Sequence, residues 1–214
     1  MLEDFFESLP EHHFDLFRVF QETEKQSSVW RDRKLLSLHI GSVNLMNQIR
    51  LLFGKPVIRD RSQLLSAIKD LQSRHGCIVQ ALDADKVVSE RHIYFAAEKA
   101  LAAFSEKRNI AKDRGMEIMR YASGERQIER ALSMGISDGT KRIALVLACT
   151  GSQCRWPDAS ELSRLIEPDK AGCSFSAKAV EEAFNISSEE LQSVGEARIE
   201  DLVIERVALV DTYR

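Results

Sequence analysis

The chain has 214 residues, of which 44% are hydrophobic, and its formal net charge is −3 at pH 7. These values are typical of one well-buried domain and exclude a globally basic nucleic-acid binder of the histone type. Any RNA contact must therefore be a local basic patch. No apolar run approaches the roughly 20 residues that a membrane-spanning helix needs, and Glu3 and Asp4 are acidic where a signal peptide is basic. We expect a cytoplasmic protein with no membrane contact.

Residues 1–45 are predicted to form an N-terminal helical extension, distinct from the rest of the chain. The segment is amphipathic and rich in phenylalanine, at Phe5, Phe6, Phe14, Phe17 and Phe20. Pro10 interrupts its helical spacing. This extension either docks on another surface or stands as an appendage. A translation start at Met46 is the other reading.

Residues 46–214 are predicted to form a single α+β domain, in which a small sheet packs against several α-helices. Short apolar runs bounded by turn residues predict strands at 49–53, 77–82 and 142–149. Apolar residues at helical spacing predict helices at 62–74, 89–104, 113–122 and 126–134. Ser62 and Ser89 are the expected N-caps of the first two helices. Further helical patterns follow at 159–166, 175–184 and 190–194, before the apolar segment 199–210.

The cysteines and histidines give no sign of a metal or cofactor site. The spacing of Cys77, Cys149, Cys154 and Cys173 matches no common zinc pattern and no Cys-x-x-Cys redox pair. His92 has no second His or Cys at the helical spacing of a metal pair. We expect four reduced structural thiols. A disulfide between Cys154 and Cys173 is the alternative.

The polar turn between the helices predicted at 113–122 and 126–134 is the most informative stretch. Ser123, Arg126 and Gln127 place a hydroxyl, a guanidinium and an amide near a helix N-terminus, an arrangement that favours a phosphate or a nucleotide edge. An ordinary helix start has the same composition, so a purely structural role stays open.

The terminal segment 199–210 carries two apolar rows at helical spacing. Val203, Val207 and Val210 form one row, whereas Ile199, Leu202 and Leu209 form the other. One row can face the core and the other a partner. The alternative is a fully buried helix followed by a short strand at 208–213.

Several motifs together resemble a known family. They are Asp83-Ala-Asp-Lys-Val-Val, His92, Asn109-Ile-Ala, Met116-Glu-Ile, Ala122-Ser-Gly-Glu-Arg-Gln-Ile and Ala131-Leu-Ser-Met-Gly-Ile. In combination they look like the small regulatory subunit of the KEOPS complex, from about residue 49 to the C-terminus. Residues 1–45 depart from the pattern of that family.

The resemblance implies a non-catalytic role in the N6-threonylcarbamoyladenosine modification of tRNA. Members of the family bind and regulate the atypical kinase/ATPase subunit of the complex, and archaeal members bind the single-stranded 3′ CCA end of tRNA. Carried onto this sequence, the tRNA contact is expected at Arg120, Ser123, Arg126, Gln127 and Ile128, with Lys107 and Arg108 steering phosphates. The kinase contact is expected at Val203, Val207 and Val210.

Two functions of other classes compete with this reading. A small acyl- or phosphoryl-transfer enzyme would use His92 with Ser123 or Arg126, and it requires these side chains within hydrogen-bond reach in one pocket. A plain oligomerisation scaffold would make no RNA contact.

Overall fold

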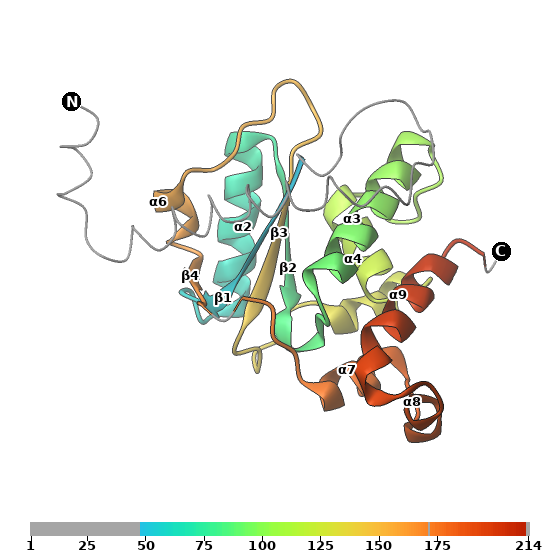
Figure 1. Cartoon of the computed structure of the whole chain (residues 1–214). Helices are drawn as coiled ribbons and strands as arrows, with labels where there is room; N and C mark the ends of the chain where they lie inside the picture. Colours follow the sequence, from blue (N-terminus) through green and yellow to red (C-terminus); the bar gives the residue numbers. More distant parts are fainter. Residues whose placement is uncertain (1–47, 171, 213–214) are drawn as a thin grey trace, which may run out of the picture.

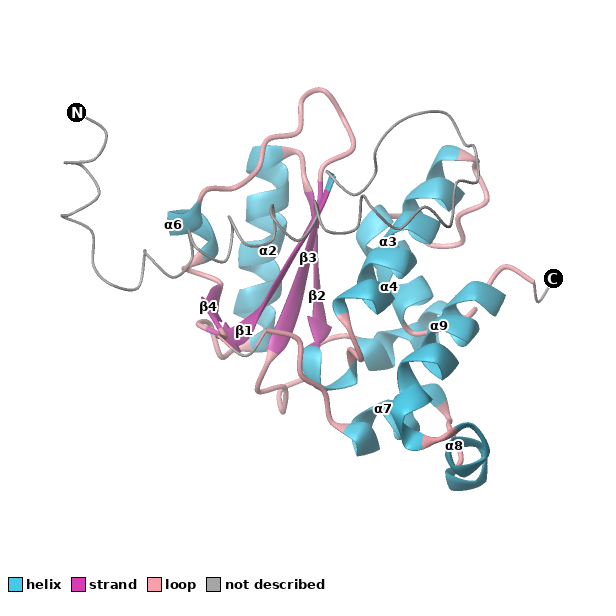
Figure 2. Ribbon diagram, viewed as in Figure 1, coloured by secondary structure: helices cyan, strands magenta, loops and turns pink. Residues whose placement is uncertain are grey.

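The computed structural model describes residues 48–170 and 172–212 (Figure 1). The extension expected at 1–45 lies outside these residues. In the described part, one four-stranded sheet lies between two groups of helices (Figure 2). The predicted α+β single-domain fold class is therefore confirmed.

The sheet has the order β2-β3-β1-β4, and each neighbouring pair of strands is antiparallel. The strands are β1 (Ile49–Pro56), β2 (Ile78–Asp83), β3 (Ile143–Ala148) and β4 (Ile166–Pro168). The first three follow the apolar runs that predicted them. β4 was missed, because its start lies in a pattern that was read as a helix at 159–166. A Cβ at Gly54 would overlap the carbonyl of Glu167, so only glycine allows β4 to pair here.

Residues on β1 and β3 alternate between two hydrophobic cores. Leu51 and Val146 point into the core shared with α3 (Glu90–Ser105), α4 (Arg114–Ala122) and α9 (Ile199–Leu209). Leu52 and Leu145 point into the opposite core, shared with α2 (Arg61–His75) and α6 (Ala159–Leu162). β3 is buried over its whole length because helices cover both faces of the sheet.

The remaining helices lie beyond the sheet, on the α3 and α9 side of the molecule (Figure 1). They are α5 (Ile128–Ala131), α7 (Ala177–Phe184), α8 (Ser188–Val194) and the short 3₁₀ turns η3 (Ala84–Lys86), η4 (Leu132–Met134) and η5 (Glu196–Arg198). α5 and η4 together replace the single helix expected at 126–134.

The starts of α2 and α3, the two longest helices of the described residues, are set by side-chain caps. Ser89 caps α3 by accepting from the His92 backbone N–H at 3.0 Å, as the sequence predicts. α2 starts earlier than expected, because Asp60 rather than Ser62 is its N-cap and accepts from the Gln63 N–H at 2.7 Å.

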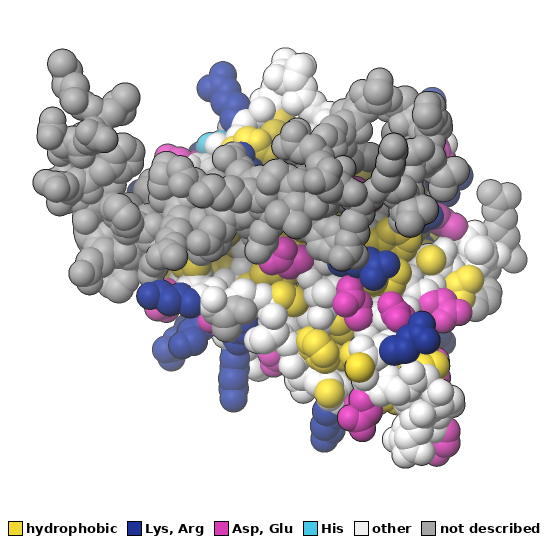
Figure 3. Space-filling view, in the orientation of Figure 1, with side chains coloured by type: hydrophobic (Ala, Val, Ile, Leu, Met, Phe, Trp, Pro, Cys, Tyr) yellow, Lys and Arg dark blue, Asp and Glu magenta, His cyan; other side chains and the backbone are white. Residues whose placement is uncertain are grey.

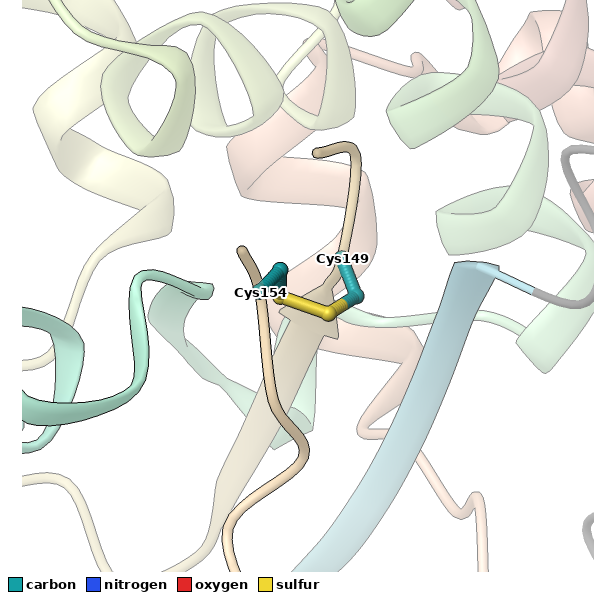
Figure 4. The surroundings of a disulfide bond; sticks show 2 residues. All are labelled: Cys149 and Cys154. Carbon is teal, nitrogen blue, oxygen red and sulfur yellow. A yellow bond between two sulfur atoms is a disulfide. The ribbon is translucent and has the colours of Figure 1, made fainter. Parts of the chain in front are cut away.

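Cys149 and Cys154 form a disulfide with a Cα–Cα distance of 5.6 Å (Figure 4). It joins the end of β3 to the segment that leads to α6. The expectation of reduced thiols is wrong for these two residues, and Cys173 is not the partner of Cys154. Cys173 is free, and its Sγ donates to the Val87 carbonyl at 3.5 Å. Burial raises the pKa of the Cys173 thiol to about 12, so it stays protonated.

Candidate functional site

The turn after α4 is held by Ser123. This side chain is 5% exposed, and its hydroxyl donates to the Arg120 carbonyl at 2.8 Å while accepting from the Glu125 N–H at 3.2 Å. Gly124 follows in the left-handed region with φ of 67°, and a Cβ there would lie 3.1 Å from Cβ of Arg206 on α9. Ser123 therefore shapes the turn and does not present its hydroxyl to a ligand.

The residues that follow the turn are exposed. Arg126 and Gln127 face solvent, and Ile128 is half-buried. Gln127 occupies the N-cap position of α5 without a side-chain capping bond, so its amide is available. One turn later come exposed Arg130 and Leu132, the latter 52% exposed. We call Arg126, Gln127, Ile128, Arg130 and Leu132 the α5 surface.

The α5 surface combines free cations with apolar side chains. Within the described residues, neither Arg126 nor Arg130 forms an ion pair. Leu132 was not among the predicted site residues, although its spacing of four from Ile128 places both on one helical face. Arg126, Gln127 and Ile128 are consecutive at the start of α5, and Arg130 and Leu132 lie beside them.

Arg120 does not belong to this surface. It is 2% exposed, and its Nη2 donates to Oε1 of fully buried Glu117 at 2.7 Å. Its guanidinium also lies over the Tyr121 ring, 4.4 Å from the centroid. A side chain this deeply buried cannot reach an RNA in this conformation. Arg120 is therefore not a contact residue, and its spacing of three from Glu117 was the sequence signal for an internal pair.

Lys107 and Arg108 lie at the opposite end of the α3–α4 hairpin. α4 separates them from the turn at Ser123 by a rise of about 12 Å, at 1.5 Å per residue. Arg108 is already engaged, with Nε 2.6 Å from Glu106 Oε2 and Nη1 3.6 Å from Asp211 Oδ1. The structure therefore does not bring these two cations to the α5 surface.

His92 is a buried contact between helices. Its Nε2 lies 2.8 Å from the Ala122 carbonyl, and its ring meets Phe184 of α7 edge-on at 5.5 Å. Burial lowers the pKa of His92 to about 4, so the ring is neutral at pH 7 and Nε2–H donates to Ala122. In the described part of the chain, no hydrogen bond joins His92 to Ser123 or Arg126. The geometry that the transfer-enzyme alternative requires is therefore not found there.

The valine row of the terminal segment lies in the core. Val203, Val207 and Val210 are buried against the helices that cover the sheet. The row is not available to a partner in this conformation, contrary to the expected kinase contact. The exposed positions of α9 are Asp201 and Glu205, and apolar Ile204 and Ala208 beside them are half-buried; we call these two apolar residues the outer face of α9. α9 continues to Leu209 and a turn follows, so no strand forms at 208–212.

Arg206 fixes α9 to its neighbours. Its Nε donates to the Phe184 carbonyl at 2.9 Å, and its Nη2 lies 2.8 and 2.9 Å from the two carboxylate oxygens of Glu190. One guanidinium therefore joins α7, α8 and α9. The sequence alone gave no reason to single out this residue.

Neither a membrane-spanning helix nor a group of metal ligands is found in the described part of the chain. None of the helices in residues 48–170 and 172–212 is long and apolar enough to cross a membrane. No three His, Cys, Asp or Glu side chains in the same residues are grouped so that they could hold a metal ion.

Comparison with known proteins identifies the family. The fold and the exposed surfaces define a single-domain α+β protein. The model of one family, kinase binding protein CGI-121, matches residues 56–211, and the chain therefore belongs to this family. The match includes both the α5 surface and α9. It confirms the resemblance seen in the sequence motifs, whereas the curated proteins include no match to the chain.

Proposed function

We propose that this chain is a non-catalytic subunit of the KEOPS complex. It binds and regulates the atypical kinase/ATPase subunit, and it recruits tRNA by the 3′ CCA end for N6-threonylcarbamoyladenosine modification. Membership of the kinase binding protein family over residues 56–211 carries the proposal. The α5 surface and the outer face of α9 supply the two contacts.

The α5 surface suits a single-stranded RNA end. Unpaired bases can be held by stacking on guanidinium planes and by hydrogen bonds to their edges. Arg126 and Arg130 supply two free guanidinium groups, and the Gln127 amide can both donate and accept. Ile128 and Leu132 supply apolar contact for the faces of the bases.

The outer face of α9 suits a protein partner. A helix that presents apolar side chains is a common recognition element between proteins. The bonds from Arg206 to α7 and α8 hold α9 in place before binding, which reduces the ordering cost on association. Ile204 and Ala208 replace the valine row as the residues proposed to contact the kinase.

Co-purification tests the kinase half of the proposal. The chain is co-expressed with the tagged KEOPS kinase subunit of the same organism, and we expect both proteins in equal amounts after affinity and size-exclusion steps. Loss of the chain during purification would reject the kinase contact.

An RNA titration tests the other half. We expect a gel shift with tRNA that weakens when the single-stranded 3′ end is removed and when salt is raised. Equal affinity for tRNA with and without that end would reject recruitment through CCA.

A further inference from the structure

A second group of cations gathers at the end of the sheet where α2 begins. Exposed Lys55 lies near the end of β1, exposed Arg59 on the connection to α2, and exposed Arg61 at the first residue of α2. Exposed Arg164 precedes β4, and the Val57 N–H donates to the Leu165 carbonyl at 3.0 Å, which brings these two connections side by side.

Exposed Lys141 completes the group. It lies two residues before Ile143, which pairs with Gly54 of β1. Figure 3 shows Lys and Arg side chains projecting from the lower left of the molecule, where Figure 1 places β4 and the start of α2. We call Lys55, Arg59, Arg61, Lys141 and Arg164 the β1–α2 surface.

Internal ion pairs do not account for these cations. None of the five pairs with a carboxylate of the described residues. The acidic residues within three positions of these cations in the chain are Asp60, Asp138, Glu161 and Glu167, and Glu161 is already paired with Arg74 and His75. Asp60 is committed to capping α2 through the Gln63 N–H. The surface thus keeps an excess of positive charge in a chain whose net charge is −3.

The presence of Arg61 in this group is not explained by the stability of α2 either. Arg61 is the first residue of this 15-residue helix, whose first turn contains no acidic residue. The N-terminus of a helix carries a partial positive charge, so arginine is disfavoured there and glutamate is favoured. Acidic Asp60 at the N-cap already complements the dipole, so the helix does not need Arg61, and its exposed guanidinium is available to an external anion.

The composition of the surface selects the kind of anion. The segments 55–61, 138–142 and 164–167 contain no aromatic residue on which a base could stack. Val57, 51% exposed, is the only large apolar side chain there that reaches this exposure, so the surface lacks the apolar anchors of a membrane-binding element. Cations without aromatics contact phosphates and do not read sequence.

We propose that the β1–α2 surface binds the phosphodiester backbone of RNA, as a site separate from the α5 surface. This inference rests on the proposed function in one respect, namely that tRNA is the RNA. The α5 surface takes the single-stranded end, and the β1–α2 surface takes phosphates elsewhere in the same molecule.

The test uses the full chain with R59E and R61E combined. We expect the affinity for tRNA to fall at least about tenfold near physiological salt, and the slope of log affinity against log salt to fall by about two. Binding of a short single-stranded oligonucleotide ending in CCA should stay unchanged. The midpoint of thermal unfolding of R61E alone should equal or exceed that of the wild type, which separates lost binding from lost folding.

A matched control carries the same change in charge elsewhere. Lys178→Glu with Arg198→Glu alters two exposed cations near α7 and α9, and we expect wild-type affinity for tRNA. Wild-type affinity of the R59E and R61E variant would overturn the inference and leave the proposed function standing. Loss of binding to anionic vesicles without loss of tRNA binding would overturn it in favour of a membrane surface. Absence of any RNA binding by the wild type would overturn both proposals.

Discussion

Glu117 and Arg120 form an ion pair of 2.7 Å in which neither side chain is more than 2% exposed. The same carboxylate accepts from the backbone N–H groups of Ala111 at 2.7 Å and Ile110 at 3.2 Å. One acid thus ties the loop before α4 to the last turn of that helix. The pair also explains why a basic residue beside the α5 surface is unavailable to a ligand.

Replacing Glu117 by alanine should lower the free energy of unfolding by about 3–5 kcal/mol, because it leaves a buried guanidinium without its counter-charge. Urea denaturation at pH 7 measures the change. Glu205→Ala, at an exposed site on α9, is the control and should change stability by less than about 0.5 kcal/mol. A loss below about 1 kcal/mol for Glu117→Ala would show that the pair is not structurally important.

Acidification should destabilise the fold through His92. Burial lowers its pKa from 6.5 to about 4. The unfolded chain therefore binds this proton more readily than the folded one, so stability falls as the pH drops from about 6.5 to about 4. Below both pKa values the loss of stability no longer changes with pH. The full difference corresponds to roughly 3 kcal/mol.

His92→Gln isolates this effect, because glutamine keeps an N–H donor for the Ala122 carbonyl and does not titrate. Urea denaturation at a series of pH values should give a flatter profile for the variant than for the wild type. Parallel profiles would show that His92 is already accessible to protons in the folded state.

Lys107 occupies a position suited to glycine. It follows α3 with φ of 57°, and the next residue, Arg108, donates its N–H to the Ala103 carbonyl at 2.8 Å. This is the pattern of a helix end that favours glycine. Lys107→Gly should raise the free energy of unfolding by about 0.5–1 kcal/mol. Asn185, with φ of 50°, is the matched control, because asparagine tolerates this conformation. Replacing it by glycine should therefore raise the free energy of unfolding by less.

Arg126→Glu should weaken tRNA binding about tenfold at low salt, because an attractive contact with phosphate becomes repulsive. The fold should be unchanged, since Arg126 is exposed and makes no ion pair within the described residues. A gel-shift titration with Arg198→Glu as the charge-matched control measures the effect. Equal affinities for the two variants would remove Arg126 from the proposed contact.

The two faces of α9 should respond differently to glutamate. Val207→Glu buries a carboxylate without a partner and should cost several kcal/mol of stability, so little folded protein is expected. Ile204→Glu lies on the outer face and should fold while losing co-purification with the kinase subunit. Circular dichroism checks the fold of each variant. A folded Ile204→Glu variant that is retained with the kinase would place the contact elsewhere.

The sequence predicted the types of most elements because their signals are local. Apolar spacing identified the helices that became α2, α3 and α4, and the continuous apolar run identified β3. Ser89 was recognised as a cap because capping involves only a few neighbouring residues. Of the proposed RNA contact, Arg126, Gln127 and Ile128 were also predicted from a local motif; in the structure Arg126 and Gln127 are exposed and Ile128 is half-buried.

Only the tertiary structure decided which strands pair, which cysteines bond and which helix faces are buried. β4 has three residues and exists because β1 offers hydrogen bonds to it. Cys149 bonds to Cys154 because the chain returns to the end of β3. Arg120 is buried because it pairs with Glu117 inside the fold. The row around Val207 is buried because it packs against the helices that cover the sheet. Periodicity along a chain shows which side chains share a face, but burial depends on contacts between segments that are distant in the sequence.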